Sequence, residues 1–192
     1  MPLIYFVRHG QTDYNAAKRI QGTLEIPVNG KGREQARRNG GLLAELIEEK
    51  KRFDFVASPL LRARQTMEIV RETMGLPAQG YRTDDRLKEI DFGAWAGLTW
   101  PEIEGRDPQG YASRQADRWN VPPPGGQCYR DVYSAVADWL QSVTSDTVAV
   151  AHYGTARCIR GIVLNLPPSQ ILDLDAPQDK VLMIEGETLR WL

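Results

Sequence analysis

The sequence predicts an α/β sandwich with a mostly parallel central sheet. Three observations indicate this fold. Short, continuous apolar runs rich in β-branched and aromatic residues are typical of strands buried on both faces. Between these runs lie longer segments whose apolar residues recur at helical spacing. The alternation of the two kinds of segment favours parallel strands joined by right-handed helical crossovers.

The chain opens with the apolar run "LIYFV" at residues 3–7, which predicts a buried strand. We expect a helix over residues 32–50 and a second strand over residues 53–58. The apolar residues that recur at helical spacing in this first helix are Ala36, Leu43, Leu46 and Ile47.

The next helix carries its own start and stop signals. Ser58 is a good N-cap residue, Pro59 suits the first helical position, and Gly75 suits the C-terminal exit. The buried stripe of this helix is expected to consist of Ala63, Met67, Val70 and Met74.

The middle of the chain, between Gly97 and Gly126, is rich in turn residues, and we interpret it as an excursion with short helical pieces. Regular elements follow it: a helix over residues 129–143, a strand over 147–151, a helix over 154–166 and a terminal hairpin that turns near Gly186. The sequence has no internal repeats or low-complexity segments. A single domain over residues 1–192 is therefore expected.

Composition and charge narrow the classes of function. The formal net charge is -1, so no overall basic field exists to hold a nucleic acid or an anionic membrane. No apolar run approaches the ~20 residues that span a bilayer, and the start lacks the features of a signal peptide. Cys128 and Cys158 lie far apart and are expected to be reduced thiols, which favours a cytoplasmic protein. With two histidines and no clustered carboxylates, neither a metal nor a cofactor is expected.

Both histidines directly follow predicted strands, His9 after the first and His152 after the strand at residues 147–151. Either histidine alone would be interpreted as an ordinary histidine of a loop. Two in the same topological position favour a shared site, because open α/β sheets bind ligands at the carboxyl ends of their strands. Gly10 and Gly154 follow closely and are expected to let the backbone approach a ligand.

Two arginines are candidates for the same site. Arg62 falls in the first turns of its predicted helix, where the helix dipole disfavours a cation, so a bound anion would compensate its charge. Arg8 supplies a second guanidinium suited to bidentate phosphate contacts. Two imidazoles and two guanidiniums predict a metal-free phosphoryl site, in which a neutral imidazole acts as nucleophile and forms a phosphohistidine. Spacing does not choose the acid that protonates the leaving alcohol among Asp84, Asp85, Glu89 and Asp91.

Several motifs are similar to those of a known family. The stretches "FVRHGQTDYN", "QGTLEIPVNGKGREQA", "SPLLRARQT", "RLKEIDFGAWAG" and "VAHYGTAR" occur in the order seen in the histidine phosphatase superfamily, in its phosphoglycerate mutase-like branch. The resemblance covers nearly the whole chain and implies a three-layer α/β/α sandwich. It implies that His9 is the phosphorylated nucleophile and Glu89 the proton donor. The residues that it implies for the phosphate pocket are Arg8, Arg62 and His152, and those for its lining or mouth are Asn15, Gln21 and Gly22.

At four positions, all expected near the site, the chain differs from the residues that are common in the family. Ala96 and Gln127 stand where an acidic residue is common, and Cys128 stands where serine is frequent. Cysteine caps a helix poorly, at a cost of ~1 kcal/mol. Tyr153 stands where glycine is common after the second histidine, so it is expected to narrow the pocket and contact the substrate. These departures bear on substrate identity more than on reaction type.

The leading prediction is a phosphatase that moves a phosphoryl group from a small-molecule phosphate ester to His9 and then to water. The alternative within the family is a phosphoglycerate mutase, although such mutases are generally longer over the active-site mouth than the segment between Gly97 and Gly126. A third alternative is an inactive, phosphate-binding member. Neither nucleic acid nor membrane is expected as a partner, and a homodimer is compatible with the sequence.

Overall fold

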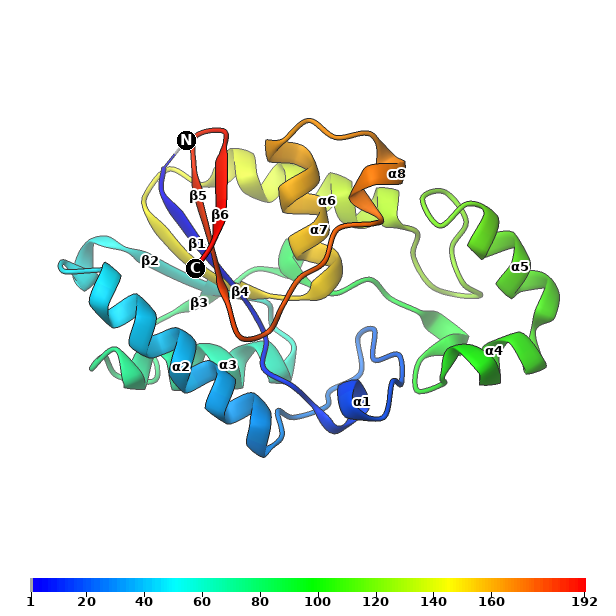
Figure 1. Ribbon diagram of the computed structural model, residues 1–192, viewed down its shortest axis with the longest axis horizontal. Helices are drawn as coiled ribbons and strands as arrows, with labels where there is room; N and C mark the ends of the chain where they lie inside the picture. Colours follow the sequence, from blue (N-terminus) through cyan, green and yellow to red (C-terminus); the bar gives the residue numbers. More distant parts are fainter. Residues whose placement is uncertain (1) are drawn as a thin grey trace.

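The computed structural model describes residues 2–192, which form one six-stranded sheet with helices on both faces (Figure 1). The strands are β1 (Ile4–Arg8), β2 (Asp54–Ala57), β3 (Arg82–Thr83), β4 (Thr147–Ala151), β5 (Val181–Glu185) and β6 (Thr188–Trp191). Their order across the sheet is β3-β2-β4-β1-β5-β6. The first four are parallel, whereas β5 runs antiparallel to β1 and β6 antiparallel to β5. The predicted sandwich with a mostly parallel sheet is confirmed.

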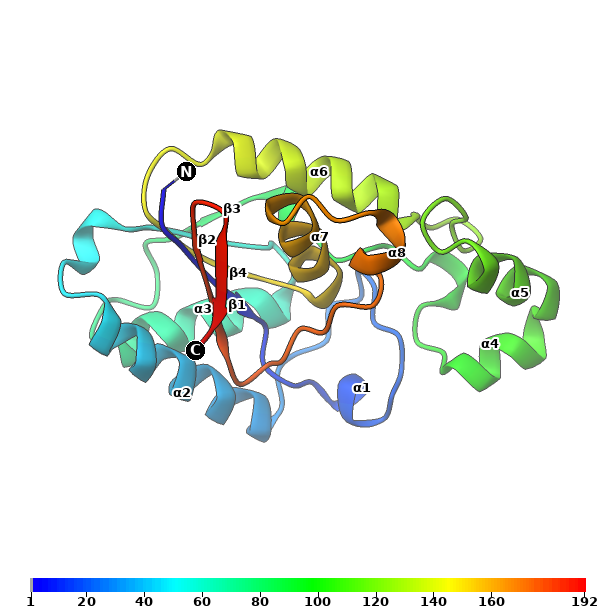
Figure 2. The ribbon, with the colours of Figure 1, turned by 45° about the horizontal axis from the view of Figure 1, so that its top comes forward.

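The helices form two layers around the sheet and a lobe beside it. One layer contains α2 (Gly30–Leu46) and α3 (Leu61–Thr73), and the other contains α6 (Tyr129–Ser142) and α7 (Tyr153–Val163) (Figure 2). The remaining elements are the short helices α1 (Asp13–Ala16) and α8 (Pro168–Ile171), the helices α4 (Trp100–Arg106) and α5 (Pro108–Ala116) of the lobe, and 3-10 turns at Lys50–Arg52, Asp85–Leu87 and Gly93–Trp95. The three layers match the architecture that the resemblance implies.

Strands β1, β2, β4 and β5 supply side chains to two separate cores. In β1, Ile4 and Phe6 pack with α6 and α7, whereas Tyr5 and Val7 pack with α2 and α3. This alternation follows from the two-residue period of a strand, and it explains why the run contains no polar residue. The expected stripe of α3 is buried at Ala63, Met67, Val70 and Met74.

The first long helix lies a few residues earlier than predicted. α2 begins at Gly30, because Asn29 precedes it and accepts a hydrogen bond from the backbone N–H of Gly32 at 2.9 Å. It ends at Leu46 rather than at residue 50, since the backbone becomes extended at Ile47 and turns that side chain into the core. Leu46, expected on the buried face, is exposed.

Ser58 does not cap α3, so that prediction was wrong, as was the placement of Pro59 at the first helical position. The helix begins at Leu61, and its N-cap residue, Leu60, makes no capping hydrogen bond through its side chain. Ser58 is fully buried after β2, with its hydroxyl 2.7 Å from Nε2 of His152. The helix starts three residues after Ser58, and Oε2 of Glu25 accepts a hydrogen bond from its first backbone N–H, that of Leu61, at 2.6 Å.

Other sequence expectations concern the hairpin, the thiols and membranes. The terminal hairpin turns at Gly186, as predicted, and the φ of this residue is 60°.

Cys128 and Cys158 are buried and unpaired, and burial raises the pKa of the Cys158 thiol to about 12. Within residues 2–192, none of the helices has the length and apolar character needed to cross a membrane.

Candidate active site

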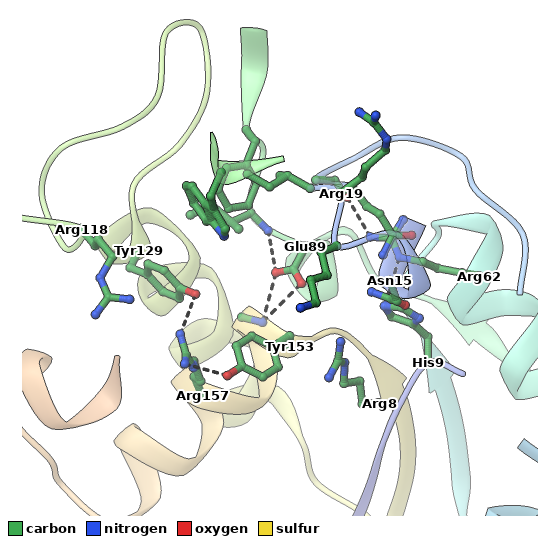
Figure 3. A pocket seen from close by; sticks show the side chains of 18 of the residues that line it. Arg8, His9, Asn15, Arg19, Arg62, Glu89, Arg118, Tyr129, Tyr153 and Arg157 are labelled. Atoms are coloured by element: carbon green, nitrogen blue, oxygen red, sulfur yellow. Dashed lines mark hydrogen bonds between the residues drawn. The ribbon is translucent and has the colours of Figure 1, made fainter. Parts of the chain in front are cut away.

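The predicted site residues meet at the carboxyl ends of β1 and β4, where the structure contains a cavity of about 520 Å³ (Figure 3). Side chains from the ends of these strands, from α3 and α7, and from the α4–α5 lobe contribute to its walls. The predicted residues that line it are Arg8, His9, Asn15, Gln21, Gly22, Arg62, Glu89 and Tyr153. His152 is fully buried, with its ring centroid 5.2 Å from that of His9. The two imidazoles therefore do converge.

The hydrogen bonds of His9 fix the position of its proton. Nδ1 lies 2.8 Å from the carbonyl oxygen of Gly10, which only accepts, so the proton is on Nδ1. The Nε–H of Arg62 donates to Nε2 at 3.2 Å, so Nε2 holds the lone pair. Burial, together with the positive charges of Arg62 and Arg8, lowers the pKa of His9 well below 6.5. His9 is a neutral imidazole with its nucleophilic nitrogen beside a guanidinium.

His152 presents a buried donor with no partner in the described part of the chain. Its Nε2 lies 2.7 Å from Oγ of Ser58, whose oxygen already accepts a weak bond from the Leu60 N–H at 3.4 Å. We assign the Ser58 hydroxyl as the donor to Nε2, and this assignment places the ring proton on Nδ1. Nδ1 is buried without a partner. Burial lowers the pKa of His152, and the positive charge of Arg62 adds to the shift. The free Nδ1–H calls for an acceptor such as an anion.

Arg62 is buried to 1% exposure and has no acidic partner among residues 2–192. Besides His9 it bonds two carbonyl oxygens, those of Leu24 at 2.9 Å and Gly22 at 2.7 Å. Burial lowers its pKa to about 10, so the guanidinium remains charged at neutral pH. Gly22 thus serves the site through its carbonyl group, which orients Arg62.

Arg8 carries a second uncompensated charge. Its Nη1 donates to the carbonyl oxygen of Ala176 at 2.7 Å, and its guanidinium lies 4.8 Å from the ring centroid of Tyr153. Its buried Nε has no hydrogen-bond partner within residues 2–192. Burial lowers the pKa of Arg8. A buried guanidinium, that of Arg62, a partly buried one, that of Arg8, and the unpartnered imidazole nitrogen of His152 make this end of the cavity complementary to a phosphate-sized anion.

Glu89 is the one carboxylate in the part of the chain described that lines the cavity. Its Oε1 accepts hydrogen bonds from the backbone N–H groups of Gly154 at 3.1 Å and Ile90 at 3.0 Å. Asp84 instead forms an ion pair with Arg86 at 2.6 Å, outside the cavity. The remaining candidates, Asp85 and Asp91, also lie outside the lining. The geometry thus favours the carboxylate that the resemblance implies.

Asn15 and Gln21 reach the cavity from the segment around α1. The Thr12 hydroxyl donates to Oε1 of Gln21 at 2.8 Å, and Gln178 donates to Oδ1 of Asn15 at 3.2 Å. Asn15 also completes the capping box of α1 with Thr12. These amides are held in place by neighbouring polar groups, as suits residues that orient a ligand.

The glycines after the two histidines leave room for neighbouring protein groups, and Gly154, unlike Gly10, also lines the cavity. A Cβ at Gly10 would collide with the backbone of Gly32, where the start of α2 crosses the segment after β1. A Cβ at Gly154 would collide with Oε1 of Glu89. Gly154 therefore lets the carboxylate approach the first turn of α7.

Of the four positions that depart from the residues common in the family, Tyr153 lines the cavity, and Ala96, Gln127 and Cys128 lie outside its lining. Cys128 leaves part of the expected capping box intact, because Oδ2 of Asp131 accepts from its backbone N–H at 2.9 Å and from its thiol at 3.2 Å.

Sequence reasoning missed several residues of the cavity. They are Lys18, Arg19, Ile20, Ile90, Phe92, Trp100, Arg114, Arg118, Tyr129 and Arg157. A signal existed for Arg157, because it lies four residues after Tyr153 on the same helix and therefore on the same face. No comparable signal marks Arg114 or Arg118, which belong to the middle segment.

The two buried histidines should make folding stability sensitive to acid. Below pH 6.5 the unfolded chain protonates each ring, whereas the folded chain resists protonation because both pKa values are lowered. The free energy of unfolding should therefore fall as the pH drops below 6.5, by up to about 1.4 kcal/mol per pH unit for each ring. Thermal melts in phosphate-free buffer measure this slope. His152→Asn should make it shallower, and an unchanged slope would contradict the lowered pKa of that ring.

Comparisons with known proteins agree on one family. The sequence profile of the histidine phosphatase superfamily (branch 1) matches residues 4–191. A glucosyl-3-phosphoglycerate phosphatase of Mycolicibacterium vanbaalenii is 33% identical over 178 residues, which cover 85% of this chain and 75% of the relative. A 2,3-bisphosphoglycerate-dependent phosphoglycerate mutase of Azorhizobium caulinodans is 30% identical, with coverages of 88% and 85%. The solved structure of a mycobacterial glucosyl-3-phosphoglycerate phosphatase, as a complex with VO3, matches with a TM-score of 0.79 at 28% identity, covering 100% of this chain and 97% of that one.

Proposed function

The chain belongs to the histidine phosphatase superfamily, and from this premise we propose that it hydrolyses phosphate monoesters of small molecules through a phosphohistidine on His9. The observation that carries the proposal is the hydrogen bonding of His9. The carbonyl oxygen of Gly10 accepts a hydrogen bond from Nδ1–H, so the lone pair is on Nε2, and the Nε–H of Arg62 donates to that nitrogen. A neutral nitrogen nucleophile next to a fixed positive charge is what attack on a phosphate ester requires.

In the first step, Nε2 of His9 attacks phosphorus, an N–P bond forms, and the bond between phosphorus and the alcohol oxygen breaks. Arg8, Arg62 and the free Nδ1–H of His152 bind the phosphoryl oxygens, whose negative charge they stabilise during transfer. Glu89, as a carboxylic acid, gives its proton to the departing alcohol oxygen.

In the second step, the carboxylate of Glu89 takes a proton from a water molecule. The water oxygen attacks phosphorus, the N–P bond to His9 breaks, and inorganic phosphate leaves. The neutral imidazole and the protonated carboxyl group are thereby restored. One carboxylate thus serves as acid and then as base, in the same position above the histidine.

The phosphoglycerate mutase alternative differs only in the acceptor, which is a hydroxyl group of the substrate instead of water. We favour hydrolysis because the segment between Gly97 and Gly126 forms only the two short helices α4 and α5 beside the cavity. Supplied with 3-phosphoglycerate and a trace of the 2,3-bisphosphate, a phosphatase releases inorganic phosphate, whereas a mutase accumulates 2-phosphoglycerate.

Our proposal includes turnover without a metal ion and a location in the cytoplasm. It includes neither a nucleic acid nor a membrane as partner, and it is compatible with a homodimer. The guanidinium groups of Arg8 and Arg62 supply the positive charge that a metal would otherwise provide. Among residues 2–192, no three His, Cys, Asp or Glu side chains are grouped so that they could hold a metal ion. The two unpaired thiols are compatible with a reducing compartment.

We expect hydrolysis of p-nitrophenyl phosphate to proceed at the same rate with and without excess EDTA. Release of p-nitrophenol is followed by absorbance, after overnight dialysis against the chelator. Loss of turnover in EDTA with recovery on adding a divalent metal would contradict metal independence. No turnover under any condition would instead favour the inactive alternative.

A further inference from the structure

The segment that connects α8 to β5, residues 173–180, is fixed next to the end of the cavity where the phosphoryl group is proposed to bind. Nη1 of Arg8 donates to the carbonyl oxygen of Ala176 at 2.7 Å. Nδ2 of Asn39, a residue of α2 that is 1% exposed, donates to the carbonyl oxygen of Gln178 at 3.1 Å. A buried asparagine needs such an acceptor, because an unsatisfied amide inside a protein costs free energy. The backbone of this segment is therefore held by both the sheet and α2.

The side chain of Gln178 bridges the proposed nucleophile and an amide of the cavity. Its Nε2 lies 3.0 Å from the carbonyl oxygen of His9 and 3.2 Å from Oδ1 of Asn15. A carbonyl oxygen only accepts hydrogen bonds, so the NH₂ group of Gln178 is the end that faces His9. The second hydrogen of the same NH₂ group is donated to Asn15. Gln178 itself lies outside the lining of the cavity.

These contacts decide which way the amide of Asn15 is turned. The two ends of an asparagine amide have nearly the same shape, but only the NH₂ end donates hydrogen bonds. The backbone N–H of Thr12 also donates to Oδ1, at 3.1 Å, so two donors from different parts of the chain hold the oxygen in place. Nδ2 has no hydrogen-bond partner within residues 2–192, and the side chain lines the cavity. The NH₂ group is therefore the end of the amide that is left for a ligand.

The orientation of this amide matters because the ligand proposed for this end of the cavity is an anion. Figure 3 shows Asn15 at the same end as His9 and Arg62. An amide oxygen turned toward a phosphoryl group would repel its oxygens, whereas an NH₂ group donates to them. The affinity for the anion therefore depends on which end of the Asn15 amide faces the cavity.

We propose that Gln178 is a positioning residue of the active site. It fixes the amide of Asn15 with its NH₂ group toward the phosphoryl group, and it holds the backbone of the nucleophile His9. Because Gln178 does not line the cavity, it acts through these two residues and not by contact with the substrate. The inference rests on the proposed function for the identity of the ligand, a phosphoryl group, but not for the hydrogen bonds that orient Asn15.

The test measures the affinity for inorganic phosphate by calorimetry, without turnover. Asn15→Ala removes the amide and should raise Kd about 10- to 100-fold, as loss of a hydrogen bond to a charged group does. Gln178→Leu removes both N–H groups of residue 178 but keeps most of the side-chain volume. It should raise Kd about 5- to 20-fold, because the amide of Asn15 is then free to turn away. An unchanged Kd in Gln178→Leu would overturn the proposal.

The double variant shows whether Gln178 acts through Asn15. Once the amide of residue 15 is absent, its orientation no longer matters, so in the Asn15→Ala background Gln178→Leu should raise Kd less than about 2-fold. A merely structural role would give the same factor in both backgrounds, and that outcome would overturn the proposal. Partial unfolding of a variant does not disturb the comparison, because it lowers the measured stoichiometry of binding and leaves the Kd of the folded molecules as it is.

Gln178→Glu tests the direction of the hydrogen bond to Asn15. Glutamate has the shape of glutamine, but its carboxylate accepts where the amide donates, so the NH₂ group of Asn15 should turn toward residue 178 and away from the cavity. Kd should then rise at least as far as in Gln178→Leu, and a smaller rise would contradict the assigned direction. The control is Gln170→Glu, which adds the same charge at an exposed position of α8 outside the cavity and should change Kd less than about 2-fold.

Turnover of p-nitrophenyl phosphate by the unaltered protein separates this inference from the proposed function. If Gln178→Leu and Asn15→Ala have coupled effects on Kd but the unaltered protein does not hydrolyse the ester, the positioning role is sustained and the phosphatase is refuted. Hydrolysis together with independent effects of the two substitutions on Kd would do the opposite.

Discussion

Replacement of His9 by asparagine is expected to lower kcat/KM for any phosphate ester by roughly 10⁴- to 10⁶-fold, as removal of an enzyme nucleophile does. Asparagine is the informative substitution because its side-chain NH₂ can donate to the carbonyl oxygen of Gly10 as Nδ1–H does now. It has no nitrogen lone pair at the position of Nε2. The geometry of the loop is thus retained while the nucleophile is lost.

The measurement combines steady-state turnover with direct detection of the intermediate. Rapid quenching of the unaltered protein with an excess of ³²P-labelled ester at high pH should trap an alkali-stable, acid-labile phosphoprotein, which is the behaviour of an N–P bond. His9→Asn should trap none while still binding inorganic phosphate, since Arg8 and Arg62 remain. Turnover in the variant above one-hundredth of the original value would refute His9 as the nucleophile.

Much of the fold was predictable because its elements depend on local patterns. The continuous apolar run at residues 3–7 and the stripe of α3 each indicate burial without knowledge of their neighbours. The edge of the sheet was less predictable. The strand at Arg82–Thr83 is only two residues long and exposed, so it has no apolar pattern, and its existence depends on pairing with β2.

The anion-binding end of the site was predictable because it lies at the carboxyl ends of neighbouring strands. His9 and His152 each follow an apolar run, and parallel neighbours bring such ends together. Contacts between distant segments were not predictable. Ser58 looks like a helix cap in sequence, and only the pairing of β2 with β4 reveals that its hydroxyl meets His152. Arg118 shows no pattern at all, because its place in the cavity depends on how the lobe folds back.

Glu89→Gln is expected to lower kcat/KM by roughly 10²- to 10⁴-fold for alkyl phosphates such as glycerol 3-phosphate, the range associated with loss of a general acid. The amide oxygen of glutamine can still accept from the N–H groups of Gly154 and Ile90, so the side chain keeps its place. What is lost is the proton for the leaving alcohol. Transfer from p-nitrophenyl phosphate should suffer much less, because p-nitrophenolate leaves with little help from a proton.

This dependence on the leaving group is the result that distinguishes an acid from a structural residue, and Gly154→Ala tests it with the carboxyl group intact. A methyl group there would collide with Oε1 of Glu89 and displace it, so the alkyl ester should again lose more activity than the aryl ester. Gly41→Ala, in open space on α2, provides the matched control and should leave both rates unchanged. Equal losses for both esters in Glu89→Gln would mean that the carboxylate supports the pocket without donating the proton, and the acid would have to be sought elsewhere.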